Sequence, residues 1–160
     1  MTLFTDVISG DEMFSDAFPI KVVDDIVYEV DCAMIEVDRE HEVFTEEEEE
    51  EEDNTILVNN LVHSFNLTRT SLDKKTYMLY LKGYMKKILK HVKETNPDRA
   101  EAFEQGAAQY AKKIIANFKD LEHYVGASVD PDAMVAILNY REDGVTPYFT
   151  FWKDGLRTKV

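Results

Sequence analysis

The sequence predicts an α+β fold, with short antiparallel strands at both ends of the chain and a pair of helices inserted between them. Three observations lead to this class. The turn signal Asp143-Gly144 separates two apolar runs near the C-terminus. Short apolar runs divided by turn residues fill residues 1–44. Between residues 71 and 118, apolar side chains recur every three or four positions, which is the spacing of an amphipathic helix.

The strands near the C-terminus have the clearest signal. An apolar run, Met134 to Leu138, precedes Asp143-Gly144, and an aromatic run, Tyr148 to Trp152, follows it. Glycine accepts the positive φ that a tight turn requires, so this order predicts a β-hairpin. A second turn signal, Asp154-Gly155, predicts the end of the aromatic strand.

The N-terminal region predicts a further hairpin, because Asp24-Asp25 separates Ile20–Val23 from Ile26–Val30. Apolar residues occupy every other position of the second run, which predicts a strand with one apolar face: Ile26, Tyr28 and Val30. We expect Met34–Val37 to continue the sheet after a bend. We expect Ile56–Leu67 to resume the chain as a strand.

Residues 71–119 predict a helical hairpin. The first helix is predicted from Ser71 to Val92, with Ser71 as its cap and Asp73 at the positive end of its dipole. Its apolar stripe comprises Tyr77, Leu81, Tyr84, Ile88 and Val92, widened by Met78, Met85 and Leu89. Asn96-Pro97 then predicts the start of a second helix, from Asp98 to Phe118. The short connection favours an antiparallel pair.

An unbroken acidic run extends from Glu46 to Asp53. Like charges at this density repel, so residues 43–55 are predicted to form a disordered loop. Specific calcium sites need six to eight oxygens that converge at fixed geometry, and such a run offers charge without geometry. The acids therefore predict at most weak, salt-sensitive Ca²⁺ binding, with a solvated loop and its counterions as the alternative. The calcium candidates are Glu46, Glu47, Glu48 and Asp53.

The charge is divided unevenly along the chain. The net charge is −14, which argues against a nucleic-acid partner. Residues 71–119 nevertheless hold eleven Lys and Arg against five Asp and Glu, a net charge of +6, and the remainder has a net charge of −20. The lysine stripe Lys82, Lys86, Lys90 and Lys93 follows the polar side of the first helix. It indicates a solvated face, a surface covered by the acidic loop, or a contact for an acidic partner.

Length and composition indicate one domain over residues 1–160. No apolar stretch reaches the length that spans a bilayer, and the N-terminus does not read as a signal peptide. Cys32 is the only cysteine, so no internal disulfide is possible. A single cysteine with no disulfide partner fits a reducing compartment, and we expect a cytoplasmic protein.

No motif predicts catalysis or a cofactor. The chain lacks a CxxC, an HExxH, an EF-hand loop and a glycine-rich phosphate loop. Cys32 shares no motif with any histidine, and a sulfoxide reductase would need a second thiol. We therefore expect Cys32 to be an ordinary buried residue and the protein not to be an enzyme.

Three segments, in order and at a characteristic spacing, give the chain its resemblance to a known family. They are Asp11–Asp16 (Asp-Glu-Met-Phe-Ser-Asp), Ala116–Asp120 (Ala-Asn-Phe-Lys-Asp) and Asn139–Tyr148. With them the chain resembles the translationally controlled tumour protein family over nearly its whole length. The resemblance implies a β-tent core with a projecting helical hairpin, a shape related to nucleotide-free chaperones of Rab proteins and to methionine sulfoxide reductases.

The resemblance also implies partners. Members of the family are described as binding calcium, microtubules, small GTPases of the Rheb type and the elongation factor that carries aminoacyl-tRNA, with roles in growth control and cell survival. The implied GTPase contact falls on Glu12, with Asp11 and Asp16 in the same segment. A second family glutamate follows a glycine, and this chain has Gly126-Ala127 at that place. The loss of this acid leaves an alternative: a calcium- or tubulin-binding module without GTPase regulation.

Overall fold

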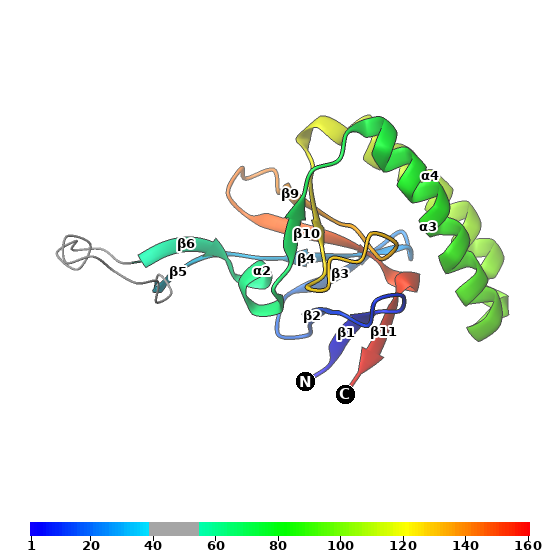
Figure 1. The fold of residues 1–160 in the computed structure, drawn as a ribbon, viewed down its shortest axis with the longest axis horizontal. Coiled ribbons are helices and arrows are strands. Elements are labelled where there is room, and N and C mark those ends of the chain that lie inside the picture. The colour runs from blue at the N-terminus through cyan, green and yellow to red at the C-terminus, as the bar shows by residue number, and fades with distance from the viewer. Residues whose placement is uncertain (39–54) are drawn as a thin grey trace.

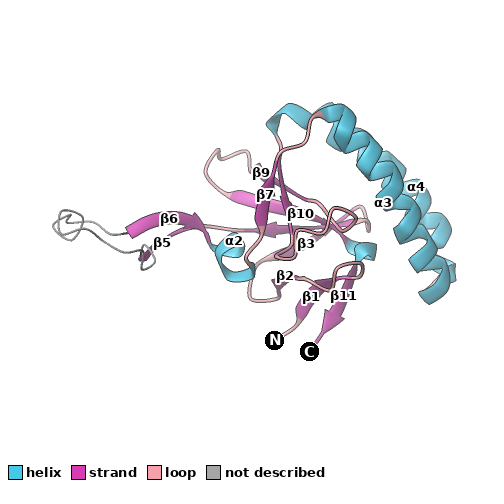
Figure 2. Ribbon diagram, in the orientation of Figure 1, coloured by secondary structure: helices cyan, strands magenta, loops and turns pink. Residues whose placement is uncertain are grey.

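The structure is a computed structural model that describes residues 1–38 and 55–160, and it has the predicted α+β architecture (Figures 1 and 2). Three helices are described: α2 (Asn60–Phe65), α3 (Lys74–Thr95) and α4 (Ala100–Ala116). Short 3₁₀ turns are η1 (Pro97–Arg99), η2 (Phe118–Asp120) and η3 (Lys153–Gly155). The strands are β1 (Leu3–Asp6), β2 (Glu12–Ser15), β3 (Ile20–Val23), β4 (Val27–Asp31), β5 (Met34–Asp38), β6 (Thr55–Asn59), β7 (Thr68–Thr70), β8 (Glu122–Val125), β9 (Ala136–Tyr140), β10 (Pro147–Trp152) and β11 (Leu156–Lys159).

Antiparallel pairing joins the described strands into a large sheet, a small sheet and a ribbon. The large sheet has six strands in the order β3-β4-β10-β9-β8-β7. The small sheet has the order β11-β1-β2, so it unites both ends of the chain, and the N- and C-termini lie side by side (Figure 1). The ribbon consists of β5 and β6 and extends away from the helices.

The predicted C-terminal hairpin is confirmed as β9 and β10, with Pro147 opposite Tyr140. The carboxylate of Asp143 accepts hydrogen bonds from the backbone N–H groups of Val145 and Thr146, both at 2.8 Å. Gly144 has φ +71°, a conformation that a side chain would strain. The turn therefore forms for the reason that the sequence indicates.

The hairpin at Asp24-Asp25 is also confirmed, as β3 and β4. Both aspartates have positive φ values, +56° and +57°, which suit the right-handed twist of the strands. Ile26 and Val30 of the predicted apolar set are buried, and Val27, which the alternation places on the opposite face, is fully buried as well. Val27 pairs with Trp152 of β10, and Trp152 packs edge-on against Tyr110 of α4. The sheet is therefore covered on both faces here.

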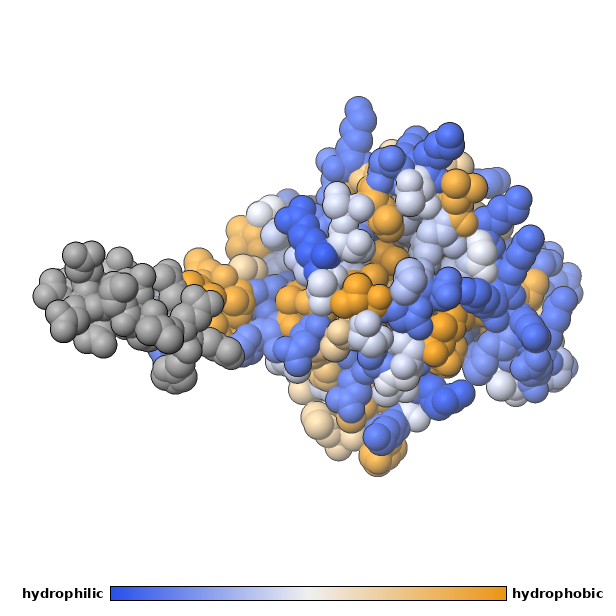
Figure 3. Space-filling model, viewed as in Figure 1, coloured by the Kyte–Doolittle hydropathy of each residue, from blue (hydrophilic) through white to orange (hydrophobic). Residues whose placement is uncertain are grey.

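Two predictions for the segment around residues 34–67 are wrong. Met34–Val37 does not continue the large sheet, since β5 pairs only with β6 among the described strands. Ile56–Leu67 is a strand only as far as Asn59, whose side chain caps α2 by accepting N–H bonds from Leu61 and Val62. The ribbon exposes apolar side chains, including Ile56 and Leu57, and Figure 3 shows an apolar area beside the grey segment. Residues 43–54 of the predicted acidic loop lie outside the described residues, and Thr55 begins β6.

The two long helices form the predicted antiparallel hairpin and lie along one side of the strands (Figure 1). Tyr110 of α4 packs against Trp152 of β10, and Tyr77 of α3 packs against His123 of β8. The predicted cap is wrong: Asp73, and not Ser71, accepts the backbone N–H of Thr76, at 2.7 Å. The predicted inner stripe of α3 is buried throughout: Tyr77, Leu81, Tyr84, Ile88 and Val92. Pro97 begins η1, which separates α3 from α4.

Arg99 attaches the turn of the hairpin to the body. Its guanidinium forms a two-pronged ion pair with Asp154, at 3.0 and 2.9 Å, and bonds to the carboxylate of Asp25 at 2.6 Å. Behind it, Gly106 of α4 lies so close to Ile26 that a Cβ would be 2.4 Å from the isoleucine Cδ1. The hairpin is thus attached along its length, and one side of each helix faces the sheet.

Candidate functional site

The predicted Glu12 contact stands at the start of β2, directly after the β1–β2 loop, and a buried carboxylate holds that loop in place. Asp6 is 2% exposed, and one of its oxygens accepts the backbone N–H of Ile8 at 2.8 Å. The other oxygen accepts the backbone N–H of Met134, also at 2.8 Å. Asp6 thereby fastens the loop to the segment that leads into β9.

A second contact joins the same loop to the turn after β8. The carboxylate of Asp11 accepts hydrogen bonds from the hydroxyl of Ser128 at 2.7 Å and from its backbone N–H at 3.2 Å. Gly126 leaves room for this approach, because a Cβ there would be 2.4 Å from the Asp11 oxygen. Glu12 and Ala127 adjoin the bonded pair in sequence, and both are exposed. We call Asp11, Glu12, Ala127 and Ser128 the Glu12 surface.

The three acids of the segment Asp11–Asp16 differ in their hydrogen-bond partners. The Asp11 carboxylate already accepts a hydrogen bond from the Ser128 hydroxyl. Asp16 lies at the other end of β2, where its carboxylate accepts the backbone N–H of Thr2 at 3.1 Å. Glu12 has no ion pair or side-chain hydrogen bond with any residue of 1–38 or 55–160. Of the three, Glu12 is the carboxylate that is free to contact a partner.

The loop after Gly126 is linked to α3 as well as to Asp11. Asp132 forms an ion pair with Lys87, at 3.2 Å. The hydroxyl of Tyr80 donates to the carbonyl of Ala133 at 2.6 Å and accepts the N–H of Val135 at 2.9 Å. The Glu12 surface is therefore positioned by groups from three parts of the chain.

The lysine stripe lies on the exposed side of α3, as predicted. Within the described part of the chain, none of Lys82, Lys86, Lys90 and Lys93 forms an ion pair, whereas their neighbour Lys87 does. The stripe and the β5–β6 ribbon lie at opposite ends of the molecule (Figure 1). The stripe therefore lies far from the ribbon.

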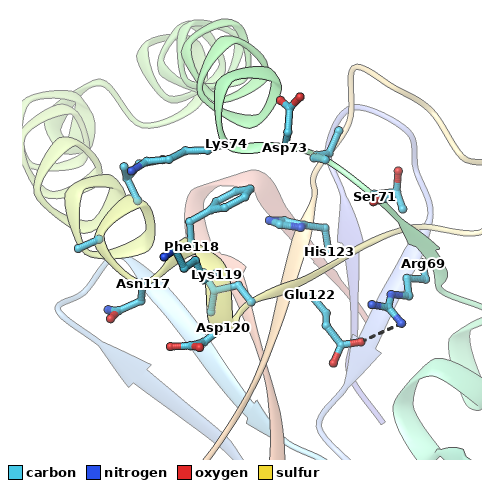
Figure 4. Close-up of a pocket in the computed structure, with 15 residues that line it drawn as sticks. Arg69, Ser71, Asp73, Lys74, Asn117, Phe118, Lys119, Asp120, Glu122 and His123 are labelled. Carbon is cyan, nitrogen blue, oxygen red and sulfur yellow. Dashed lines mark ion pairs between the residues drawn. The ribbon is translucent and has the colours of Figure 1, made fainter.

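A hollow of about 1040 Å³ opens where the hairpin meets β7 and β8 (Figure 4). The rings of His123 and Phe118 lie side by side in it, with centroids 5.1 Å apart, and an ion pair joins Arg69 to Glu122 at its edge. His123 is 4% exposed, and its Nε2 has no hydrogen-bond partner among the described residues. Burial lowers the pKa of this imidazole, which favours its neutral form. His123 is not among the predicted site residues, and the alternation of buried and partly buried positions along β8 is the signal that could have indicated it.

Neither the thiol nor the acids of the described chain form a reactive centre. Cys32 is buried, its Sγ donates to the carbonyl of Val30, and burial raises the pKa of the thiol to about 12. A thiol in this state is a poor nucleophile. No group of three or more metal-binding side chains occurs in residues 1–38 and 55–160. The calcium candidates Glu46, Glu47, Glu48 and Asp53 lie outside the described residues.

The fold defines the class of protein: an α+β chain of antiparallel sheets into which a helical hairpin is inserted. The family model described as translationally controlled tumour protein matches residues 1–157. The chain belongs to this family, which is non-enzymatic.

Individual relatives agree with that assignment. A translationally controlled tumour protein homologue from Yarrowia lipolytica is 56% identical over 98% of both chains. The structure of the tumour-associated protein p23fyp from Schizosaccharomyces pombe superposes with a TM-score of 0.89, at 53% identity, and covers 100% of this chain and 99% of that one. The family member from Caenorhabditis elegans has a TM-score of 0.76 at 26% identity, with 100% and 98% covered. Within the described part of the chain, no helix is both long and apolar enough to cross a membrane.

Proposed function

We propose that this protein is a cytoplasmic regulatory binding protein that contacts a small GTPase or an elongation factor through the Glu12 surface. The observation that carries this proposal is the contact between Asp11 and Ser128. It sets an unpaired carboxylate, Glu12, beside an exposed turn on a support that is fixed by Asp6 and Tyr80. A rigid, acidic surface of this kind suits a basic patch on a partner.

Ala127 limits the effect that the Glu12 surface has on a GTPase partner. The family resemblance places a second glutamate there, and an alanine supplies neither a charge nor a hydrogen-bond acceptor. We infer that the protein binds its GTPase partner without strongly promoting nucleotide release. Growth control and cell survival are the processes that the resemblance associates with such binding.

Release of a fluorescent nucleotide from a Rheb-type GTPase tests this proposal. The wild type should release nucleotide slowly. Ala127→Glu should accelerate release or tighten binding by about tenfold, equivalent to about 1.4 kcal/mol, and Glu12→Ala added to that variant should reverse the gain. Glu142→Ala is the matched control, since Glu142 is also an exposed acid but lies in the β9–β10 turn. Rapid release by the wild type that Glu12→Ala does not change would contradict the proposal.

A second candidate function is binding of an acidic protein surface, such as a microtubule, by the lysine stripe. It is favoured by the exposure of the four lysines and by the absence of ion pairs between them and the described residues. Exposed charge pairs contribute only about 0–1 kcal/mol each, and salt screens them over about 8–10 Å. Co-sedimentation with microtubules should therefore fall steeply with salt and should be lost when all four lysines are replaced by alanine.

Weak calcium binding remains a proposal based on the acids between Glu46 and Asp53. Because a run of glutamates offers charge without a fixed cage, its affinity should be low and should fall as salt is added. Calorimetric titration of the full chain with Ca²⁺ at two salt concentrations tests this expectation, and tight, salt-independent binding would contradict it.

A further inference from the structure

The seam between α3 and α4 is hollowed on the side away from the sheet. Two adjoining hollows, of about 490 and 230 Å³, share Met85 and Ala111. Residues of α3 and α4 alone line both of them, so the seam opens to solvent and not to the body. We call this seam the hairpin furrow, and its apolar lining includes Met78, Met85 and Leu89 of α3 and Ala108, Ala111 and Ile115 of α4.

The furrow exists because the facing helices carry side chains of different size. Ala108 and Ala111 fill little space on α4, whereas the long Met78 and Met85 of α3 form a wall above them. Met78 remains 49% exposed, although it belongs to the apolar stripe that the sequence assigns to the core. Methionine is flexible and polarisable, so such a wall adapts to an apolar partner.

The lysine stripe runs along this furrow. Lys82 lines the larger hollow and Lys86 the smaller one, while Lys112 adds a charge from α4. Glu104 is the single acid that lines either of them. Lys90 and Lys93, together with Glu94, line a further hollow that shares Lys86 and Leu89 with the smaller one. An apolar floor is thus bordered by positive charge.

We infer that the hairpin furrow binds an amphipathic helix of a protein partner, with an apolar face bordered by acidic residues. The lining from Met78 to Leu89 spans about 16 Å of α3, which corresponds to about three turns of a bound helix. Apolar side chains at helical spacing would enter the furrow, and flanking Glu or Asp would meet the lysines. This inference does not depend on the Glu12 surface.

Other occupants fit less well. A bilayer binds apolar side chains that protrude, and here they line a hollow. A second copy of this hairpin would bring lysines against lysines. The chain's own Glu46–Asp53 run contains no apolar residue and cannot fill the furrow.

Adjacent residues of α3 provide a matched test. Met78 lines the furrow, whereas its neighbour Leu79 is 66% exposed and lines neither hollow. Met78→Glu and Leu79→Glu add the same charge to the same helical turn, so only the place of that charge differs. The probe is a synthetic helical peptide with leucines at positions i, i+4, i+7 and i+11 and glutamates on both flanks. A scrambled peptide of equal composition, polyglutamate and anionic phospholipid vesicles are the comparison ligands.

Fluorescence anisotropy with the full chain should show saturable binding of the amphipathic peptide. Met78→Glu should weaken that binding by about tenfold or more, and Leu79→Glu by less than about twofold, since the removal of apolar contact adds to the shared charge effect. The scrambled peptide and polyglutamate should bind at least about tenfold more weakly than the amphipathic peptide. Equal binding of polyglutamate, equal effects of the two substitutions, or binding to vesicles without binding to the peptide would overturn the inference.

Discussion

The two apolar faces of α3 differ in what covers them. The inner face, represented by Tyr84 and Ile88, is buried against the body and α4. The outer face, represented by Met78 and Met85, borders a furrow that no other described element covers. Both faces belong to the same helix and to the same predicted stripe. The difference teaches that helical periodicity identifies apolar side chains, whereas the size of the facing residues decides which of them become core.

Removing a side chain from the inner face should have the largest effect. Ile88 is 0% exposed, so Ile88→Ala should lower the free energy of unfolding by about 2–5 kcal/mol through lost burial and a cavity. Met78→Ala, on the outer face, should cost less than about 1 kcal/mol. Urea unfolding of the two variants measures this contrast. If their costs were equal, the distinction between the two faces would be wrong.

Detaching the hairpin turn should have an intermediate effect. Arg99→Ala leaves Asp154, whose side chain is 11% exposed, without its two-pronged partner, which should cost about 1–3 kcal/mol. Lys153→Ala is the control, because Lys153 pairs with Asp25, whose side chain is 65% exposed, and such a pair is worth about 0–1 kcal/mol. Thermal unfolding of both variants decides the point. Equal melting temperatures for the two would show that Arg99 does not anchor the hairpin.

The smallest effect concerns His123, at the base of the inner face, and it depends on pH. Because burial lowers the pKa of His123 in the folded state, the unfolded chain takes up this proton at higher pH than the folded one. His123 therefore lowers the free energy of unfolding as the pH falls below about 6.5, the ordinary histidine pKa. His123→Phe preserves the ring contacts with Tyr77 and Phe118 and removes this cost.

Unfolding experiments at pH 8, 7 and 5.5 test that expectation. The difference in free energy between wild type and His123→Phe should change by no more than about 0.2 kcal/mol from pH 8 to pH 7. At pH 5.5 the free energy of unfolding of the variant should have risen relative to that of the wild type. A difference that is independent of pH would mean that solvent reaches His123 in the folded protein.

The elements that the sequence predicts well are those with local causes. Asp143-Gly144 and Asp24-Asp25 determine their turns through backbone conformations that depend on a few neighbouring residues. The inner stripe of α3 follows from spacing alone. The helix α2 was missed although its cap is local: Asn59 accepts N–H bonds from Leu61 and Val62, but the apolar run around it was interpreted as a strand. Asp73 replaces Ser71 as the cap of α3, a difference of two positions that propensity alone does not resolve.

The candidate surfaces depend on contacts that pattern reasoning cannot foresee. Glu12 and Ala127 follow from the resemblance, but the bond between Asp11 and Ser128 joins residues 117 positions apart in the chain. The furrow depends on Ala108 and Ala111 facing Met85 across a gap, which requires the relative placement of two helices. The lysines could be predicted, whereas the apolar floor between them could not.

The position of β10 in the large sheet has a consequence for the folding of the nascent chain on the ribosome. β10 stands between β4 and β9, so it joins one half of the sheet, β3-β4, to the other, β9-β8-β7. Nascent chains that have emerged only as far as Tyr140 hold both halves but lack the strand that unites them. β1 likewise pairs with β11, whose partner residues lie 150 or more positions later in the chain. The described fold is therefore complete only after β10 and β11 have emerged, and a chain truncated before Pro147 leaves the edges of β4, β9 and β1 open to chaperones and proteases.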